Sequence, residues 1–400
     1  MRILLVTSIL PYPPISGFPI RVYNLLKRMA NEHEVWLVSL NSDLVNPEHV
    51  SQLQKLCKGV KVIIEPHRRG FDKPLDWLRY LMAGIPPDLR FNYNERLIST
   101  IRELASQVDF DVVQIEDTYM ARYLEALPRG FRAKTVLTFH DVIFRKYARI
   151  YKIQPKLRKK FRHWLHSTMM RRWEPNYAEK FDLCVAMSEV DRALLLSVNP
   201  RLKVDIIPNG VDTKVYQALP YDTSTESLLF VGDMDYVPNV DAVLFFNREI
   251  LPRIQKVIPD VEMWVVGMNP PDTVKQLDGK TLHVTGRVES VWPYYQCSNV
   301  CVIPLRAGGG TRLKILEAMA LGRPVVSTSI GCEGLEVLDG ANILIADNPE
   351  VFAQKTLLLL KNNEFRQQII YNARQLVETH YDWDILADNY NQAIIRLKSG

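Results

Sequence analysis

Short, unbroken apolar segments recur along the chain, and stretches with helical spacing separate most of them. Buried strands of parallel sheets have this pattern, because helices cover both faces of such sheets. Thirteen segments fit it: 3–6, 35–40, 60–64, 112–115, 135–139, 183–186, 204–207, 228–231, 263–266, 282–284, 300–303, 324–327 and 343–346. One open sheet of thirteen strands would be unusually large, so the pattern predicts two α/β units, each with a doubly wound, Rossmann-like sheet.

The chain has 400 residues, a length that suits two domains. We predict that they join near residues 216–226, a polar stretch that contains proline and has no periodicity. An N-terminal domain is expected over residues 1–215 and a C-terminal domain over 216–381, with a final helix at 382–400 packing back on the first. Ligands of doubly wound folds bind at the carboxyl ends of the strands, so the expected site lies in a cleft between two facing domains.

Cysteine content and hydropathy exclude several protein classes. The five cysteines are scattered and include no C-x-x-C motif, which indicates a reduced cytoplasmic protein without structural zinc. No apolar run reaches the ~18–20 residues that a membrane-spanning helix needs. The apolar residues 3–10 lack the cleavage site of a signal peptide, so we expect a buried first strand there.

The net charge of +5 is unevenly spread, because residues 145–172 hold eleven Lys or Arg and no Asp or Glu. Within this segment an apolar stripe with helical spacing comprises Leu157, Phe161, Trp164, Leu165, Thr168, Met169 and Trp173. The favoured interpretation is a helix that buries this stripe in the core and leaves its basic face in solvent. The alternative is an anionic membrane surface bound through residues 145–173. No nucleic-acid-binding motif accompanies the charge, so no nucleic acid is expected as a partner.

A glycine-rich stretch, RAGGGTRLKILEAMALGRPVVS, runs from residue 306 to residue 327. Gly308, Gly309 and Gly310 permit the close approach of a ligand. Thr311 is the expected N-cap of a helix over residues 312–321, and the free N–H groups at such a helix start favour an anion.

Lys314 and Glu317 lie three residues apart and therefore share one face of this helix. The helix dipole disfavours a cation near the helix start unless a polyanion binds beside it. Lys314 on a diphosphate and Glu317 on a ribose would together bind a nucleotide diphosphate. An ordinary surface ion pair has the same spacing, so the spacing alone leaves both interpretations open.

The stretch GGGTRLKILEAMALGRPVVS resembles the donor-binding segment of retaining glycosyltransferases of family 4, which have the GT-B fold. The beginning of the chain, residues 1–40, resembles the family's first strand, glycine loop, helix and second strand. Further motifs follow in the family's order: TFHD from residue 138, VAMSEVDR from 185, IIPNGVD from 206 and LLFVGDMDYVPNVDA from 228.

The resemblance implies a donor site in the C-terminal domain. A nucleotide diphosphate sugar would be held by Glu317 on the ribose and by Lys314 and Arg312 on the diphosphate, with N–H groups from 308–311 as further donors. In the N-terminal domain, Gly17 would approach the donor phosphate.

The resemblance also implies where the reaction takes place. His140 would lie at the reaction centre with a proton or hydrogen-bond role, to which histidine side chains as a class are suited. Arg21 and Glu116 are the candidates for binding the acceptor.

Two features depart from the family's pattern. The family commonly has two glutamates with seven residues between them; Glu317 is the second, but Gly309 occupies the place of the first. Asp233 stands where the family usually has an Arg on the diphosphate, and the Lys that follows in the family is missing. Arg312 and Lys314 are the expected substitutes.

We therefore expect a retaining, metal-independent glycosyltransferase that needs no cofactor. It would move a sugar from a nucleotide diphosphate sugar to a glycan or lipid-linked acceptor in polysaccharide or glycoconjugate biosynthesis, in the cytoplasm or peripherally on the inner face of the membrane. Two alternatives stay open: a nucleotide-sugar epimerase of the same fold, and a non-catalytic nucleotide-sugar-binding component of a polysaccharide assembly system. An epimerase would need acid–base carboxylates near the sugar, and Gly309 supplies none.

Overall fold

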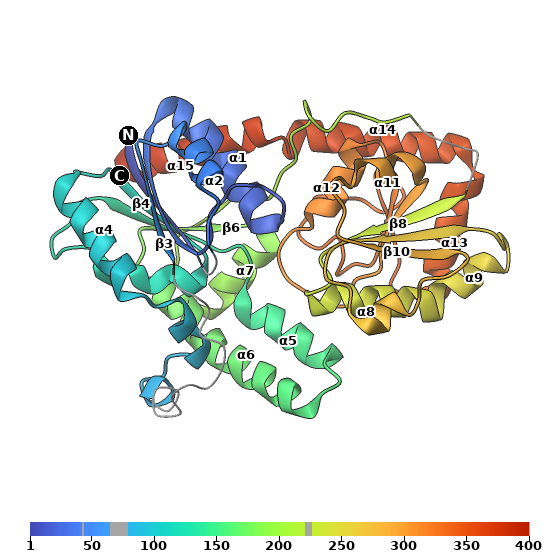
Figure 1. Cartoon of the computed structure of the whole chain (residues 1–400), viewed down its shortest axis with the longest axis horizontal. Coiled ribbons are helices and arrows are strands. Elements are labelled where there is room, and N and C mark those ends of the chain that lie inside the picture. The colour runs from blue at the N-terminus through green and yellow to red at the C-terminus, as the bar shows by residue number, and fades with distance from the viewer. Residues whose placement is uncertain (42–43, 65–78, 221–225, 400) are drawn as a thin grey trace. The chain divides into compact units, whose positions relative to one another are not determined.

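The computed structural model describes residues 1–41, 44–64, 79–220 and 226–399 (Figure 1). Contacts divide the chain into two compact units. The first comprises Met1–Ala148, Arg158–Pro208 and Leu386–Gly400, and the second comprises Arg149–Leu157 and Asn209–Ile385. Of the stretch predicted to join the domains, residues 221–225 lie outside the described residues.

The first unit is built on seven parallel strands in the order β3-β2-β1-β4-β5-β6-β7. The strands are β1 (Arg2–Thr7), β2 (Glu34–Asn41), β3 (Gly59–Ile64), β4 (Val112–Glu116), β5 (Lys134–Thr138), β6 (Leu183–Ala186) and β7 (Val204–Ile206). The direction of strand addition reverses between β1 and β4, and the carboxyl edge at such a switch point is where doubly wound sheets bind ligands.

Helices connect these strands and cover the sheet. They are α1 (Gly17–Glu32), α2 (Pro47–Gln54), α4 (Glu95–Gln107), α5 (Ile143–Ile153), α6 (Leu157–Ala178), α7 (Glu189–Val198) and α15 (Trp383–Ser399), with the 3₁₀ segments η1 (Pro87–Asn92) and η2 (Thr118–Ala126). Of these, residues 149–153 of α5, Leu157 of α6 and residues 383–385 of α15 belong to the second unit. Side-chain caps mark several helix starts, because the Asn94 amide oxygen accepts the Leu97 N–H and the Ser188 hydroxyl accepts the Asp191 N–H.

The second unit is built on six parallel strands in the order β10-β9-β8-β11-β12-β13. The strands are β8 (Ser227–Val231), β9 (Glu262–Val266), β10 (Leu282–Gly286), β11 (Val300–Ile303), β12 (Val325–Ser327) and β13 (Leu344–Ile345). The helices are α8 (Val237–Phe245), α9 (Leu251–Gln255), α10 (Asp272–Lys275), α11 (Trp292–Cys297), α12 (Leu313–Ala320), α13 (Pro349–Lys361) and α14 (Asn363–His380), and a π-helical turn, η3 (Phe246–Ile250), lies between α8 and α9.

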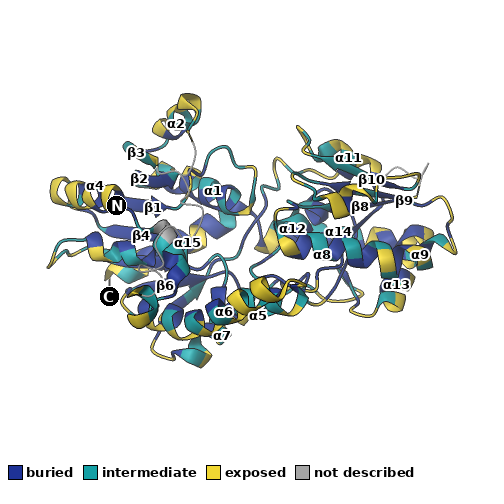
Figure 2. Cartoon of the chain, turned by 60° about the horizontal axis from the view of Figure 1, so that its bottom comes forward, coloured by how far each residue is buried: buried dark blue, intermediate teal, exposed yellow. Residues whose placement is uncertain are grey.

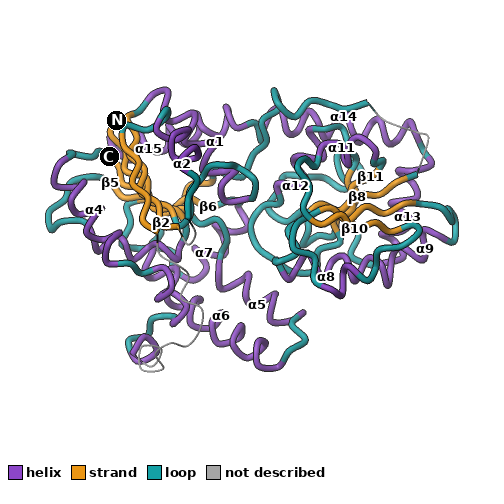
Figure 3. The backbone as a smooth tube through the Cα atoms, viewed as in Figure 1, coloured by secondary structure: helices purple, strands orange, loops and turns teal. Residues whose placement is uncertain are grey.

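The prediction of two doubly wound sheets is confirmed. Each of the thirteen predicted segments overlaps one observed strand, and the ends differ by at most two residues. Figure 3 shows the strands of each unit at its centre with helices around them. Central strands are buried along their whole length, as in β4, where even the polar Gln114 and Glu116 are buried. This burial explains why the strands appear in the sequence as unbroken apolar runs.

The predicted burial of the α6 stripe is only partly observed: Leu165, Met169 and Trp173 are partly buried, and Trp173 packs against the core of the first unit. Leu157, Phe161 and Trp164 are 82%, 62% and 47% exposed, and Figure 2 shows exposed positions along this helix. The side of α6 that faces the core instead carries His166 and Met170, followed by Glu174, Pro175, Tyr177 and Ala178. Hydrophobic spacing located the helix, but the buried side is centred one residue further along the chain, on His166, Met170 and Glu174.

The predicted helix after the glycines is observed with a small shift. It begins at Leu313 rather than residue 312, ends at Ala320, and has Arg312 rather than Thr311 as its N-cap residue. The Thr311 hydroxyl caps nothing: the residue is 6% exposed, and its oxygen has no hydrogen-bond partner among the described residues. Buried hydroxyls normally have a partner, so this one is available to a ligand.

Candidate functional site

The predicted site residues form two sets, one in each unit, and the first set lies at the carboxyl edge of the seven-stranded sheet. Glu116 ends β4 and pairs with Thr138, the last residue of β5, and His140 follows in the loop after β5. The Nε2 atom of His140 lies 2.6 Å from Oε2 of Glu116. The carboxyl ends of two neighbouring strands therefore bring these side chains together.

A row of hydrogen bonds continues behind this pair. The Thr138 hydroxyl lies 3.2 Å from Oε1 of Glu116, and the Gln114 amide donates to the same oxygen. The Tyr390 hydroxyl, from α15, donates in turn to Oε1 of Gln114 over 2.6 Å. Glu116, Gln114 and Tyr390 are each at most 2% exposed. His140 thus lies at the outer end of a buried hydrogen-bond network that includes Glu116, Gln114 and Tyr390.

Electrostatics keep the Glu116 carboxylate charged. Burial alone would raise its pKa, but the hydrogen bond and charge of His140 and the charge of Arg21 outweigh burial, so the pKa lies below its ordinary value. Arg21 is itself 1% exposed and donates to the backbone oxygen of Pro208 over 2.6 Å. Burial lowers the pKa of Arg21 to about 10, although Glu116 acts to raise it. The predicted acceptor residues Arg21 and Glu116 are therefore both inside the unit.

Gly17 is the first residue of α1 and is exposed. The Ser16 side chain before it makes no capping hydrogen bond, so the first N–H groups of this helix are not capped by it. The Phe18 ring packs against the His140 ring with their centres 4.5 Å apart. The start of α1 is thus next to the histidine.

The second set lies in the second unit around the start of α12. Lys314 is partly buried, and its Nζ atom donates to Oδ1 of Asn239 over 3.1 Å and lies 4.3 Å from the centre of the Phe230 ring. A Cβ atom at Gly232, directly after β8, would lie 2.7 Å from Nζ and would displace the Lys314 ammonium group from this position. Glycine at the end of β8 therefore makes room for the ammonium group.

The pKa values of Lys314 and Glu317 move toward each other. Burial, with a contribution from Arg312, lowers the pKa of Lys314 to about 7, while Glu317 acts to raise it. Burial raises the pKa of Glu317 to about 7, against the effects of Lys314 and a hydrogen bond with Tyr216. An anion bound beside Lys314 would restore its charge, and Glu317 can both donate and accept hydrogen bonds near neutral pH.

The glycine loop before α12 adopts backbone angles that require glycine. Gly308 has φ 124° and Gly310 has φ 68°, in the left-handed region. The Arg312 guanidinium is turned back onto this loop, where it donates to the backbone oxygens of Gly309 and Gly310. Its Nε atom is buried and has no partner among the described residues. The loop, Thr311 and Lys314 thus offer hydrogen-bond donors at one helix start.

A second basic side chain contacts the same loop. Arg149 donates to the backbone oxygen of Gly308 over 3.2 Å and forms a two-pronged ion pair with Glu333, at 2.5 and 2.9 Å. Glu333 lies on the loop that follows β12, the strand next to β11.

Sequence reasoning missed several of these residues. Asn239 lies within the motif VGDMDYVPNVDA, and the proline before it marks a helix start, but nothing in the sequence pairs it with Lys314. Tyr216 lies in the stretch predicted to be a linker. Arg149 and Glu333 are 184 residues apart, and only the fold brings them together.

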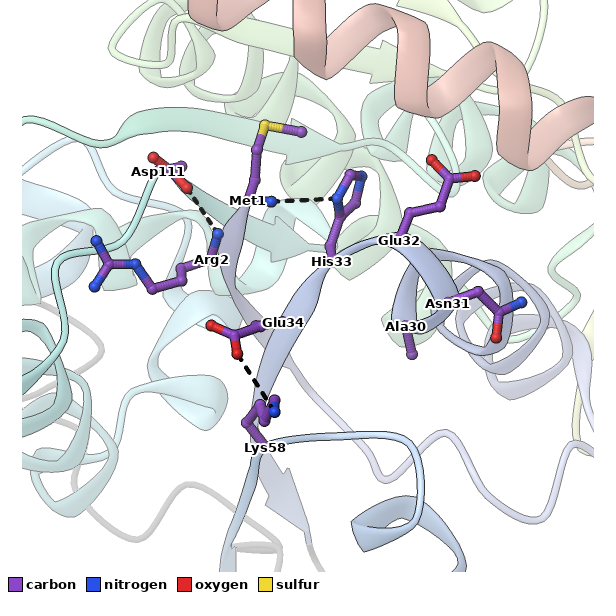
Figure 4. Close-up of a pocket in the computed structure, with 9 residues that line it drawn as sticks. All are labelled: Met1, Arg2, Ala30, Asn31, Glu32, His33, Glu34, Lys58 and Asp111. Carbon is purple, nitrogen blue, oxygen red and sulfur yellow. Dashed lines mark hydrogen bonds and ion pairs between the residues drawn. The ribbon is translucent and has the colours of Figure 1, made fainter.

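A surface hollow at the opposite, amino-terminal edge of the first sheet holds none of the predicted residues (Figure 4). Its interactions are ordinary for a strand edge: the Met1 amino group approaches His33 at 3.4 Å, and Lys58 pairs with Glu34 at 3.3 Å. Since doubly wound sheets bind ligands at the carboxyl edge, this hollow is not the candidate site.

Across the described residues, no helix is both long enough and apolar enough to cross a bilayer. The same residues contain no cluster of three or more His, Cys, Asp or Glu side chains that could hold a metal ion.

Comparison with known proteins identifies relatives along the whole chain. A family model described as Glycosyltransferase Family 4 matches residues 15–215, and one described as Glycosyl transferases group 1 matches residues 225–362. An uncharacterized 44.6 kDa protein in the cps region of Klebsiella pneumoniae is 21% identical over 394 residues, which cover 95% of this chain and 96% of that protein. A phosphatidyl-myo-inositol mannosyltransferase of Mycolicibacterium smegmatis is 25% identical over 222 residues, which cover 53% and 56% of the two chains.

Solved structures share the fold at low sequence identity. Sucrose-phosphate synthase from Thermosynechococcus elongatus superposes with a TM-score of 0.72 at 17% identity and covers 100% of both chains. The Anabaena protein Alr3699/HepE in complex with UDP-glucose gives a TM-score of 0.69 at 16% identity, covering 98% of this chain and 99% of its own. The GT-B fold predicted from the sequence is thereby confirmed.

Proposed function

Because the chain belongs to Glycosyltransferase Family 4, we propose that it transfers a sugar from a nucleotide diphosphate sugar to a glycan or lipid-linked acceptor in polysaccharide or glycoconjugate biosynthesis. The enzyme is a retaining glycosyltransferase that uses a nucleotide sugar, as its family does. The acceptor, the pathway and the roles of individual residues are parts of the proposal.

The surroundings of Lys314 are the main support for a nucleotide-sugar site at the start of α12. Its ammonium group is partly buried near a helix start, with the neutral Asn239 amide as its hydrogen-bond partner and Glu317 one turn away. A buried cation at this place is unfavourable unless an anion compensates both it and the helix dipole. The diphosphate of a nucleotide sugar meets this need, and a structural relative binds UDP-glucose.

The remaining donor contacts follow from the same helix. Glu317, one turn after Lys314, would bind the ribose hydroxyls. The N–H groups of residues 308–311, the Thr311 hydroxyl and Arg312 would surround the diphosphate, while Gly17 would allow a phosphate to approach the start of α1. These donors replace the Arg and Lys that the family usually places after β8.

Catalysis requires the diphosphate to leave with its charge stabilised. The bond between the anomeric carbon and the diphosphate oxygen breaks, and a bond from that carbon to the acceptor oxygen forms on the same face. The acceptor proton passes to the leaving diphosphate. Lys314 and the helix N–H groups bind the leaving group more strongly as its charge develops, and this difference lowers the barrier. The His140 imidazole would lie beside the reacting sugar and the acceptor hydroxyl and would hydrogen-bond there.

The exposed face of α6 is suited to bind an anionic membrane surface, where a lipid-linked acceptor would lie. Leu157, Phe161 and Trp164 are exposed on a helix whose neighbouring positions are Lys and Arg, within the basic segment 145–173. Apolar side chains that enter the interface and cations that attract anionic lipid together bind a helix to a membrane. A relative over part of the chain is a phosphatidyl-myo-inositol mannosyltransferase, which accords with a lipid acceptor.

A transfer assay tests the proposal. Purified protein is incubated with radiolabelled UDP-, GDP- and ADP-sugars and a membrane extract, and products are separated into lipid, glycan and free-sugar fractions. Label in a lipid or glycan fraction that requires the protein is expected. Isomerised nucleotide sugar without transfer would instead identify an epimerase, and binding without any turnover would identify a non-catalytic component; either result overturns the proposal.

A further inference from the structure

Glu116 is buried at the end of β4, with 1% of its surface exposed. Acceptor binding was predicted for it from the sequence, but its hydrogen bonds in the described part of the chain go to protein groups. We propose that Glu116 is a positioning residue whose carboxylate fixes the orientation and tautomer of the His140 imidazole. The role of this imidazole in turnover rests on the proposed function, whereas its tautomer does not.

The hydrogen bond between the two side chains has one direction. An ionised carboxylate has no proton to donate, and the pKa of Glu116 lies below its ordinary value. The hydrogen therefore sits on Nε2 of His140, which donates to Oε2 of Glu116 over 2.6 Å. In the neutral imidazole, Nδ1 then keeps its lone pair for a substrate group. His140 is 14% exposed at its side chain, so the ring can be reached from outside.

The carboxylate is itself oriented by a second row of side chains. Gln114 and Thr138 donate to Oε1 of Glu116, which leaves Oε2 for His140. The Tyr390 hydroxyl donates to the oxygen of Gln114 and so turns the nitrogen of that amide toward Glu116. Hydrogen bonds in series in a buried site strengthen and orient one another. The helix near the end of the chain, α15, thereby contributes to the position of a histidine in the loop after β5.

The backbone at this point carries a second, independent feature. Asp117, the residue directly after Glu116, has φ 82°, a left-handed conformation that a residue other than glycine seldom adopts. Its N–H donates to the backbone oxygen of Thr138 over 3.1 Å, which ties the end of β4 to the end of β5. Strained residues persist where the surrounding structure holds a functional geometry in place. Here the strain lies between the strand ends that carry the two partners.

A purely structural alternative is that Glu116 only neutralises the buried charge of Arg21. The two roles differ in what they predict for His140. A neutralising carboxylate would leave the histidine tautomer and the turnover rate unaffected once the fold is intact. A positioning carboxylate controls both.

The test compares Glu116→Gln with the wild-type enzyme and with Glu103→Gln, an exposed glutamate of the same unit, as a matched control. Imidazole ¹⁵N chemical shifts are recorded on labelled protein, and the His140 signals are assigned with His140→Ala among the eight histidines. We expect wild-type His140 to show the Nε2–H tautomer, and Glu116→Gln to show a mixture of tautomers at an unchanged melting temperature. The same His140 shifts in both proteins would overturn the inference, whatever the enzyme transfers. If Glu116→Gln unfolds, Glu116→Asp keeps a negative charge near Arg21 but withdraws the carboxylate from His140, and unchanged His140 shifts in that variant would likewise overturn the inference.

Kinetics then separate positioning from acceptor binding. With the sugar nucleotide that supports turnover in the panel of UDP-, GDP- and ADP-sugars, Glu116→Gln is expected to lower kcat at least about tenfold, since general acid–base groups contribute ~10²–10⁴-fold. The donor KM should change less than twofold, and Glu116→Gln should cause no further loss in the His140→Ala background. A raised acceptor KM at unchanged kcat, or additive losses in the double variant, would overturn the proposal. Absence of turnover in the wild-type protein would count against the proposed function alone, because the tautomer measurement is independent of it.

Discussion

Replacing Lys314 with methionine should weaken nucleotide binding without destabilising the protein. Methionine keeps most of the length of the side chain and its packing on Phe230, but removes the ammonium group beside Asn239. Most substitutions of partly buried residues destabilise the folded protein. A variant that loses nucleotide affinity but keeps its stability therefore indicates that Lys314 serves binding rather than folding.

The substitution should lower nucleotide affinity and raise folding stability, and the size of each effect can be worked out from the surroundings of Lys314. Losing one partner of a buried, hydrogen-bonded charge pair costs about 2–5 kcal/mol, so the nucleotide Kd should rise about 30-fold or more. Burial lowers the pKa of Lys314 from 10.5 to about 7, and at about 1.4 kcal/mol for each pKa unit the buried charge costs at most about 5 kcal/mol of folding free energy. Without Lys314 the pKa of Glu317 rises further, which offsets part of the gain from its removal.

The sign of the pH dependence follows from the lowered pKa. Below about pH 7 both folded and unfolded protein carry the Lys314 charge, and the destabilisation is complete. It disappears as the pH rises toward 10.5, where neither state is charged. The advantage of the methionine variant in unfolding free energy should therefore be largest at and below about pH 7 and should shrink steadily as the pH rises toward 10.5.

Calorimetry with UDP-glucose and with GDP- and ADP-sugars measures the Kd, and thermal unfolding without nucleotide between pH 6 and 10 measures the stability. Lys275→Met, at an exposed lysine of the same unit that pairs with Asp272, is the matched control and should change neither quantity. An unchanged Kd in Lys314→Met would refute the donor assignment. A melting temperature below wild type at pH 7 would refute the view that the charge is destabilising in the protein alone.

Three further predictions concern other parts of the chain. His140→Ala should lower kcat by about 10²-fold or more while donor affinity from calorimetry changes little, and a wild-type rate would show that the residue is structural. Changing both Leu157 and Phe161 to Ser should reduce co-sedimentation with phosphatidylserine-containing liposomes at least about tenfold, since burying each side chain contributes about 1.5–3 kcal/mol. The control Leu44→Ser should not reduce it. Co-sedimentation that does not change with anionic lipid, with salt or with the double substitution would exclude a membrane surface as the partner of this helix. Burial raises the pKa of Glu174 to about 8, so wild-type stability should fall as the pH rises from the ordinary value of 4.5 through 8. Glu174→Gln should therefore melt near the wild-type temperature at about pH 4.5 and increasingly above it as the pH rises to 9, and a difference in melting temperature that does not grow with pH would contradict this assignment.

The fold could be predicted closely because its strands are buried on both faces. Such strands have continuous apolar runs whatever their neighbours are, so both sheets and their thirteen strands are visible before any contact is known. The helix after the glycines was also visible from its glycine entry and the shared face of Lys314 and Glu317. Its cap was misplaced by one residue, since several polar residues at a helix start are chemically equivalent in a sequence.

Contacts between distant residues could not be predicted. Glu116 was recognised as a polar residue at a strand end, but its hydrogen bond with Gln114, and that of Gln114 with Tyr390, 276 residues after Gln114, were not visible in the sequence. The exposed face of α6 was assigned to the core because its apolar stripe was the stronger pattern. His166 and Glu174 occupy the core instead, and their buried partners are not visible in the spacing.

A crystal structure with the sugar nucleotide that most raises the melting temperature tests the central claim most directly, since a ligand that binds only the folded protein must stabilise it. We predict that a diphosphate oxygen will lie within hydrogen-bond distance of Lys314 Nζ at the start of α12, with the ribose hydroxyls on the Glu317 carboxylate. A nucleotide bound elsewhere, or a diphosphate that leaves Lys314 without contact, would contradict the account.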